Sequence, residues 1–242
     1  MLMRPFRGRM SNSEKKLRCE LSSFEKLFGV EIVNFEYYYK VFGNCMFDLI
    51  CDNETFSFVT DRGSVIINHE MEADAITHED LLQEMTLICA KKRSKDEKAT
   101  YDQCVKMLGS DNYLMHAYAS FFFPLADTTP VKEQIDLLEN ALRRGQNSWA
   151  VMLLVRQLLI LGQKKYFTFF VSAINDPFAK IRCTMLRIIP DVIECLSEDE
   201  RHILQLFLEE REKIEGDIFG TEGLFNMIIR TLKRYFVYDP SK

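Results

Sequence analysis

The chain is poor in the residues that most often carry catalytic or metal chemistry. It has four histidines and one tryptophan among 242 residues. Its seven cysteines are an odd number at irregular spacings with no CxxC pair, which argues against zinc-finger and thioredoxin-type motifs and indicates buried thiols in a reducing compartment. We therefore expect no metal, no cofactor and a cytoplasmic location.

A long uninterrupted apolar run is also missing. The longest apolar stretch, residues 149–161, is broken by Arg156 and Gln157 and falls short of the roughly 20 residues that a membrane-spanning helix needs. Residues 1–10 contain three arginines but lack the apolar core of a secretion signal, so we expect a flexible tail there, with Met10 as an alternative start. No membrane association is expected.

Positive charge is in deficit, because the net charge is -5. Since nucleic-acid affinity comes mainly from Lys and Arg neutralising phosphates, this balance argues against general nucleic-acid binding. What the chain does have is 47% apolar residues, enough for a substantial core.

The first part of the chain shows the pattern of β-strands. Residues 30–70 contain four short runs rich in β-branched and aromatic residues. Phe56 and Phe58 fall on one face of the third run, and Val65 and Ile67 fall on one face of the fourth, which predicts a sheet with one buried side. The connections are too short for crossover helices, which predicts an antiparallel meander. A covering helix over residues 13–28 is predicted by an apolar stripe of Leu17, Leu21, Phe24, Leu27 and Phe28.

The pattern turns helical after Ala73. We therefore predict an α+β fold with an α+β domain over residues 11–73 and a helical domain over residues 74–242. Thr77 is placed as an N-cap, and Ser94 with Glu97 forms a capping-box pattern, which predicts helices over 78–91 and 95–108, followed by an apolar segment over 112–123.

Helical segments in the C-terminal part group as pairs. Capping and proline patterns at Thr129-Pro130, Asp176-Pro177 and Ser197 with Glu200 mark helix starts. The predicted pairs are 131–144 with 148–161, 164–174 with 178–194, and 198–213 with 220–236. Their starts lie 33 and 34 residues apart, which is typical of an array of helical hairpins, because one hairpin cannot bury its apolar faces alone. Pro190 is expected to kink or split the helix that contains it.

The stretch "NDPFAKIRCTMLRIIP" within the middle pair, residues 164–194, resembles the turn inside a HEAT repeat. In that family an aspartate is followed five residues later by an aliphatic residue and then an arginine, and Asp176, Ile181 and Arg182 match this pattern with Pro177 after the aspartate. The resemblance implies an α-solenoid in which the Asp and Arg side chains form ladders between neighbouring repeats. The neighbouring pairs do not repeat the motif.

One segment concentrates negative charge. Between Glu194 and Asp217 there are nine acidic and three basic residues, a local charge of -6 against -5 for the whole chain. A solvated helix face is the simpler interpretation. The functional interpretation is a surface for a basic protein partner, since concentrated charge of one sign speeds association with the opposite sign. Its candidate residues are Glu198, Asp199, Glu209, Glu210 and Glu212.

The sequence thus favours a non-catalytic protein-binding module, with an immunity or inhibitor protein that neutralises a toxin or nuclease as an analogy. Two alternatives stay open. One is an enzyme assembled from dispersed residues, for which Cys104 and His116 are the candidate nucleophile and base. Neither stands in a recognisable catalytic motif, and a buried cysteine beside an unrelated histidine is the simpler interpretation. The other is a HEAT-like nucleic-acid binder using Arg230, Lys233 and Arg234, whose spacing also suits the positive end of a final helix. The oligomeric state is not indicated.

Overall fold

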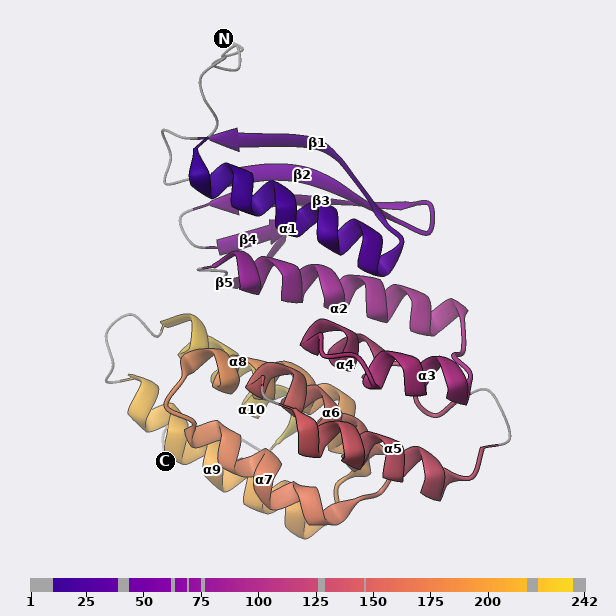
Figure 1. Ribbon diagram of the computed structural model, residues 1–242. Helices are drawn as coiled ribbons and strands as arrows, with labels where there is room; N and C mark the ends of the chain where they lie inside the picture. Colours follow the sequence, from indigo (N-terminus) through magenta and orange to yellow (C-terminus); the bar gives the residue numbers. More distant parts are fainter. Residues whose placement is uncertain are drawn as a thin grey trace. The chain divides into compact units, whose positions relative to one another are not determined.

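The computed structural model describes most of the chain, and Figure 1 shows its helices and strands. The described residues are 11–38, 44–61, 64–68, 70–74, 77–125, 129–145, 147–216 and 222–236. The chain divides into two compact units, Met1–Asp96 and Glu97–Lys242, which we describe separately. The expected tail at residues 1–10 lies outside the described residues. The α+β fold class predicted from the sequence is confirmed.

The first unit is built on an antiparallel sheet. Its strands are β1 (Glu31–Tyr38), β2 (Asn44–Cys51), β3 (Glu54–Asp61), β4 (Ser64–Ile67) and β5 (Glu70–Asp74). They pair in chain order, so the sheet is the predicted meander. The fifth strand was not predicted, because its sequence EMEAD has no β-branched or aromatic residue and consists largely of Glu, Asp and Ala, which are depleted in strands.

One face of this sheet carries the core of the unit. Phe47 of β2 and Phe58 of β3 are almost fully buried and stack with their ring centroids 5.1 Å apart, and Val65 and Ile67 of β4 are buried as predicted. The helix α1 (Asn12–Phe28) packs against β1, and α2 (His78–Asp96) packs against both β2 and α1.

The helix α1 follows the predicted stripe with one exception. Leu17, Leu21, Phe24 and Phe28 are buried, whereas Leu27 is 36% exposed. Buried positions in this helix recur at intervals of three and four residues, and Leu27 falls between two of them.

The predicted end of α2 was wrong. The Ser94 capping box is not formed, because α2 continues through Ser94 to Asp96. The next helix, α3 (Tyr101–Leu108), begins at a capping box of Thr100 and Gln103 instead. Inside α2, Arg93 pairs with Asp52 at 2.9 Å, a contact distant in sequence that ties the helix end to the sheet.

The predicted domain boundary followed residue 73, and the structure groups α2 with the sheet.

The second unit consists of helical hairpins. After α3 come α4 (Tyr113–Ser120), α5 (Val131–Arg144), α6 (Ser148–Ile160), α7 (Phe167–Ser172), α8 (Ala179–Val192), α9 (Glu198–Gly216) and α10 (Glu222–Tyr235). Short 3₁₀ turns flank α7 at Lys164–Tyr166 and Ala173–Asn175 and follow α8 at Ile193–Cys195. The α5/α6, α7/α8 and α9/α10 hairpins occupy the predicted pairs, and α3/α4 adds a hairpin before them.

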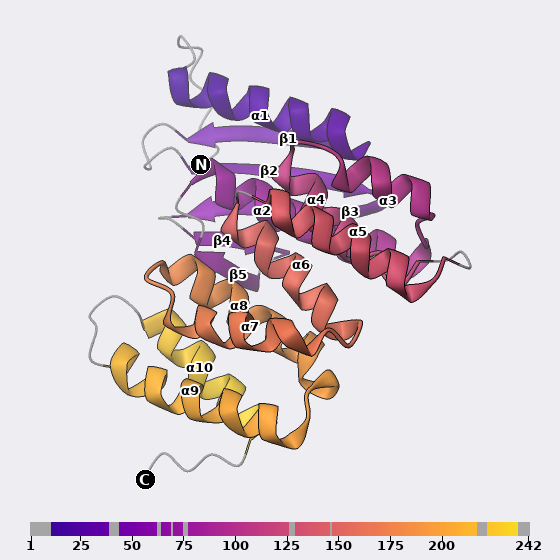
Figure 2. The same ribbon diagram turned by 60° about the horizontal axis from the view of Figure 1, so that its bottom comes forward.

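The hairpins follow one another along the unit from α3/α4 to α9/α10 (Figure 2). The second helices stack side by side, since α6 packs against α4 and α8, and α8 packs against α10. Among the first helices, α3 contacts α5 and α7 contacts α9. The core between them includes Trp149, Leu154 and Leu158 of α6 and Ile189 of α8.

One of the three predicted helix caps in this unit is formed and two are not. The Ser197–Glu200 capping box is formed, with the Glu200 carboxylate 2.8 Å from the Ser197 amide nitrogen. The predicted cap at Thr129 was wrong, because Pro130 occupies the cap position of α5. The cap at Asp176 was also misplaced, because α8 begins at Ala179 with Phe178 as its N-cap. The α8 helix is not split at Pro190 and runs on to Val192.

The described residues contain no helix that is both long enough and apolar enough to span a membrane.

Candidate functional site

The five acidic residues singled out from the sequence all lie on α9. Glu198 and Asp199 are exposed in its first turn, and Glu210 is exposed farther along. Glu209 and Glu212 are half-buried, and Glu209 accepts a hydrogen bond from Gln205 at 2.7 Å. The five carboxylates therefore lie on one helix, but three of them are exposed and two are half-buried.

Two other carboxylates of the acidic segment form ion pairs with basic side chains of the second unit. Glu200 bonds to Lys164 at 2.7 Å and Glu194 pairs with Arg201 at 3.3 Å. Burial opposes ionisation of Glu200, but the Lys164 ammonium and the Ser197 groups outweigh it and lower the pKa of this carboxyl. Asp217 lies outside the described residues. Because Lys164 lies outside the acidic segment, its pairing with Glu200 makes the net negative charge near this segment smaller than the local count of -6 suggests.

Arg182 joins the two last hairpins. Its Nη1 donates to the carbonyls of Asp176 at 2.7 Å and Pro177 at 3.1 Å, and its Nε lies 2.8 Å from Glu215 Oε1 of α9. The Asp176 carboxylate accepts from the Phe178 amide at 2.8 Å. The motif residues thus serve the turn before α8, and Arg182 reaches the next hairpin through Glu215. Ile181 is buried in the core.

Sequence reasoning missed a set of exposed apolar side chains on the second unit. All the exposed large apolar residues described there lie on the first helices of the hairpins or on the turn before α8; they are Val105, Val131, Phe169, Phe178, Ile203, Leu206 and Ile214. Phe178 is 70% exposed and Leu206 is 50% exposed. Large apolar side chains that are exposed to solvent mark a candidate interaction surface.

Three of these exposed apolar residues lie on α9. Its buried stripe is Leu204, Leu208 and Glu215, at helical spacing. Ile203, Leu206 and Ile214 fall outside that stripe and share the exposed side of the helix with Glu210. Phe169 and Phe178 belong to α7 and its following turn, and α7 packs against α9. We call the exposed residues Phe169, Phe178, Glu198, Asp199, Ile203, Leu206, Glu210 and Ile214 the α7–α9 surface.

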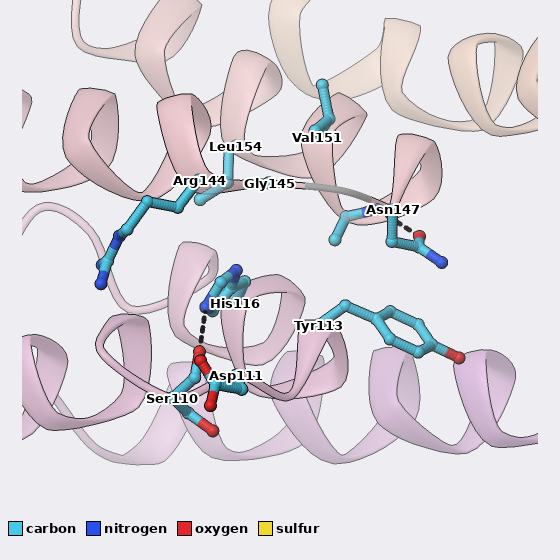
Figure 3. A pocket seen from close by; sticks show the side chains of 10 residues that line it. Ser110, Asp111, Tyr113, His116, Arg144, Gly145, Asn147, Val151 and Leu154 are labelled. Atoms are coloured by element: carbon cyan, nitrogen blue, oxygen red, sulfur yellow. Dashed lines mark hydrogen bonds between the residues drawn. The ribbon is translucent and has the colours of Figure 1, made fainter.

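A cavity of about 540 Å³ lies elsewhere in the second unit, between α4 and the α5–α6 connection (Figure 3). Ser110, Asp111, His116 and Arg144 are among its polar lining residues. His116, one of the two residues considered for catalysis, lines this cavity, whereas Cys104 is buried in α3 and does not.

Two other kinds of site are a metal site and a basic surface for nucleic acid. Among the described residues no group of three or more His, Cys, Asp and Glu side chains is placed to hold a metal ion. Arg230, Lys233 and Arg234 are exposed on α10, and the last two lie in its final turn, where basic side chains favour the helix dipole.

Comparisons of the chain with models of protein families, with curated protein sequences and with solved structures found no match.

Proposed function

We propose that the chain is a non-catalytic protein-binding module whose second unit binds a protein partner through the α7–α9 surface. The observation that supports this most is the composition of α9, where exposed Ile203, Leu206 and Ile214 stand among exposed carboxylates. Apolar side chains that become buried at the centre of an interface contribute much of its affinity. Charged groups around them favour a partner of opposite charge.

The stacking of successive hairpins supports a HEAT-like α-solenoid as the scaffold. In such arrays each hairpin packs only against its neighbours, which leaves an extended outer layer available to partners. The partner that fits this surface carries apolar side chains ringed by Lys or Arg. A basic toxin or nuclease masked by an inhibitor of immunity type belongs to this class.

The proposal predicts that two kinds of substitution weaken the same complex. Leu206→Ser removes an apolar contact and should lower affinity for a stoichiometric partner from the native host by about tenfold, or about 1.4 kcal/mol. Replacing Glu209, Glu210 and Glu212 together with glutamine should lower affinity and flatten its dependence on salt, because fewer charges act across the interface. Quantitative affinity capture at several salt concentrations measures both effects.

The α5 helix offers matched controls. Val131→Ser removes an exposed apolar side chain outside the surface, and Glu133→Gln with Asp136→Asn removes exposed negative charge there. These controls should bind like the wild type. Equal affinity of the Leu206→Ser variant, the triple glutamine variant and the wild type would show that the partner does not use α9.

A further inference from the structure

The face of the sheet opposite the core, which we call the outer face, carries apolar side chains in adjacent strands. The solvated face of an antiparallel sheet is ordinarily polar. Here Met46 of β2 pairs with Val59 of β3, and Val59 pairs with Ile66 of β4, so the three residues lie side by side across the sheet. Met46 is 36% exposed, and Val59 and Ile66 are half-buried. We call these three residues the apolar row.

The helix α1 lies on the other face of the sheet. Successive residues of a strand point to opposite faces, so the apolar row points away from buried Phe47 and Phe58. Arg18 of α1 lies 4.2 Å from the centre of the Phe35 ring, and Phe35 stacks on Phe47. The helix therefore covers the core face and leaves the apolar row in contact with solvent.

Tyr38 extends the apolar row toward the edge of the sheet. It belongs to β1 and is 41% exposed. Its hydroxyl donates to the Glu36 carboxylate at 2.5 Å and lies 3.0 Å from Met46 Sδ. An exposed aromatic ring with a polar end is typical of the centre of a protein interface.

Carboxylates flank the apolar row. Glu36 pairs with Met46 across β1 and β2, and Asp48 and Asp61 lie two residues beyond Met46 and Val59 on their strands. The charged side chains at the described outer-face positions of β1 to β4 are all acidic; they are Glu31, Glu36, Asp48 and Asp61. None of these four forms an ion pair within the part of the chain that the structure describes.

Neutral donors hold two of these carboxylates in place. Asp48 accepts from Asn34 Nδ2 at 2.7 Å and from Ser57 Oγ at 2.6 Å. These two hydrogen bonds lower the pKa of the Asp48 carboxyl, so it is ionised at neutral pH. Asp61 accepts from Asn44 Nδ2 at 3.0 Å. The outer face thus presents positioned negative charge beside exposed apolar side chains.

We propose that the outer face of the sheet binds a segment of a partner protein that combines aliphatic or aromatic side chains with lysine or arginine. The apolar row would contact the apolar side chains of that segment, and the flanking carboxylates would pair with its basic side chains. The same carboxylates repel nucleic acid and an anionic lipid surface. A second copy of this chain would place like charges opposite one another. The outer face belongs to the first unit, so this proposal does not depend on the α7–α9 surface.

The test uses the full chain with labelled methyl groups and short synthetic peptides, followed by NMR. One peptide alternates lysine with valine, a second alternates lysine with serine, and a third alternates glutamate with valine. We expect saturable binding of the lysine–valine peptide that shifts the methyl resonances of Met46, Val59 and Ile66. The other two peptides should bind at least about tenfold more weakly, because each lacks one of the two kinds of contact.

Substitutions on the outer face should weaken binding of the lysine–valine peptide. Val59→Thr keeps the shape and the strand preference of the side chain but adds a hydroxyl that the complex would bury, and should lower affinity about fivefold or more. Glu36→Gln together with Asp61→Asn should lower affinity and flatten its dependence on salt, because fewer charges attract the lysines.

Matched controls lie at the start of the second unit. Val105→Thr makes the same change at a residue that is 41% exposed on α3, and Glu97→Gln with Asp102→Asn removes two exposed carboxylates nearby. Both controls should bind the peptide like the wild type. Equal losses in the controls and the outer-face variants would show general attraction between charges and overturn the proposal.

Three further outcomes would overturn the proposal. The first is that the lysine–valine peptide shows no saturable binding. The second is that its shifts are confined to Ile203, Leu206 and Ile214, which would place it on the α7–α9 surface instead. The third is a dimer in analytical ultracentrifugation that Val59→Thr dissociates, which would show that a second copy of the chain occupies the outer face.

Discussion

A Glu215→Gln variant is expected to lose about 3–5 kcal/mol of unfolding free energy, because it leaves buried guanidinium groups without their counter-charge. The Glu215 side chain is fully buried, and those of Arg182 and Arg211 are 8% and 12% exposed. Arg211 donates to Glu215 Oε1 from Nε at 2.7 Å. Arg182 Nε lies 2.8 Å from the same oxygen but does not form a hydrogen bond to it, so that contact is mainly an attraction between charges.

Urea unfolding followed by circular dichroism measures this effect. The matched control is Glu212→Gln, which removes a half-buried carboxylate one turn earlier on α9 and should change stability by no more than about 0.5 kcal/mol. The slope of free energy against urea should be the same for both variants and the wild type. A Glu215→Gln protein as stable as the wild type would show that the last two hairpins do not depend on the buried charges.

A Phe58→Ala variant is expected to destabilise the first unit by about 3–5 kcal/mol. Phe58 is fully buried at the centre of the sheet and stacks on Phe47, so the substitution removes apolar burial and leaves a cavity. Phe56 sits two residues earlier on β3 and is half-buried, and Phe56→Ala should therefore cost less.

Hydrogen exchange followed by mass spectrometry resolves where the loss occurs. For Phe58→Ala we expect faster exchange in β2, β3 and β4, whose backbone bonds form the sheet around the cavity. Because both side chains lie on the same face of β3, equal destabilisation by the two substitutions would contradict the expectation that the more deeply buried Phe58 contributes more to the core.

The sequence predicted elements well where local patterns dominate. The alternation around Phe58 and Val65 predicts strands with one buried face, and the reciprocal pattern of Ser197 and Glu200 predicts the start of α9; both are confirmed. Each depends on residues a few positions apart, whose geometry is set by the strand or helix itself.

Failures occurred where contacts distant in sequence decide the structure. The Ser94 pattern satisfies the rule for a capping box, yet Arg93 beside it is bound to Asp52 in the turn between β2 and β3, and α2 continues to Asp96. Strand β5 forms by pairing with β4 although its own sequence does not favour a strand.

The candidate sites illustrate the same limit. A carboxylate run is ordinarily a solvated face, and only the approach of α8 to α9 shows that Glu215 is buried beside Arg182. The spacing of Ile203, Leu206 and Ile214 against Leu204 and Leu208 was a usable signal for a second apolar stripe on α9. The cavity at His116 needs α4 and the α5–α6 connection to meet, which no local pattern reports.

The most direct test of a protein-binding second unit is hydrogen exchange of the full chain with and without its stoichiometric partner. We predict that the partner slows exchange in α7 and α9, residues 167–172 and 198–216, while α3 and the exposed start of α5 keep their rates. Protection confined to the cavity around His116, or to the sheet of the first unit, would contradict the proposal that the α7–α9 surface binds the partner.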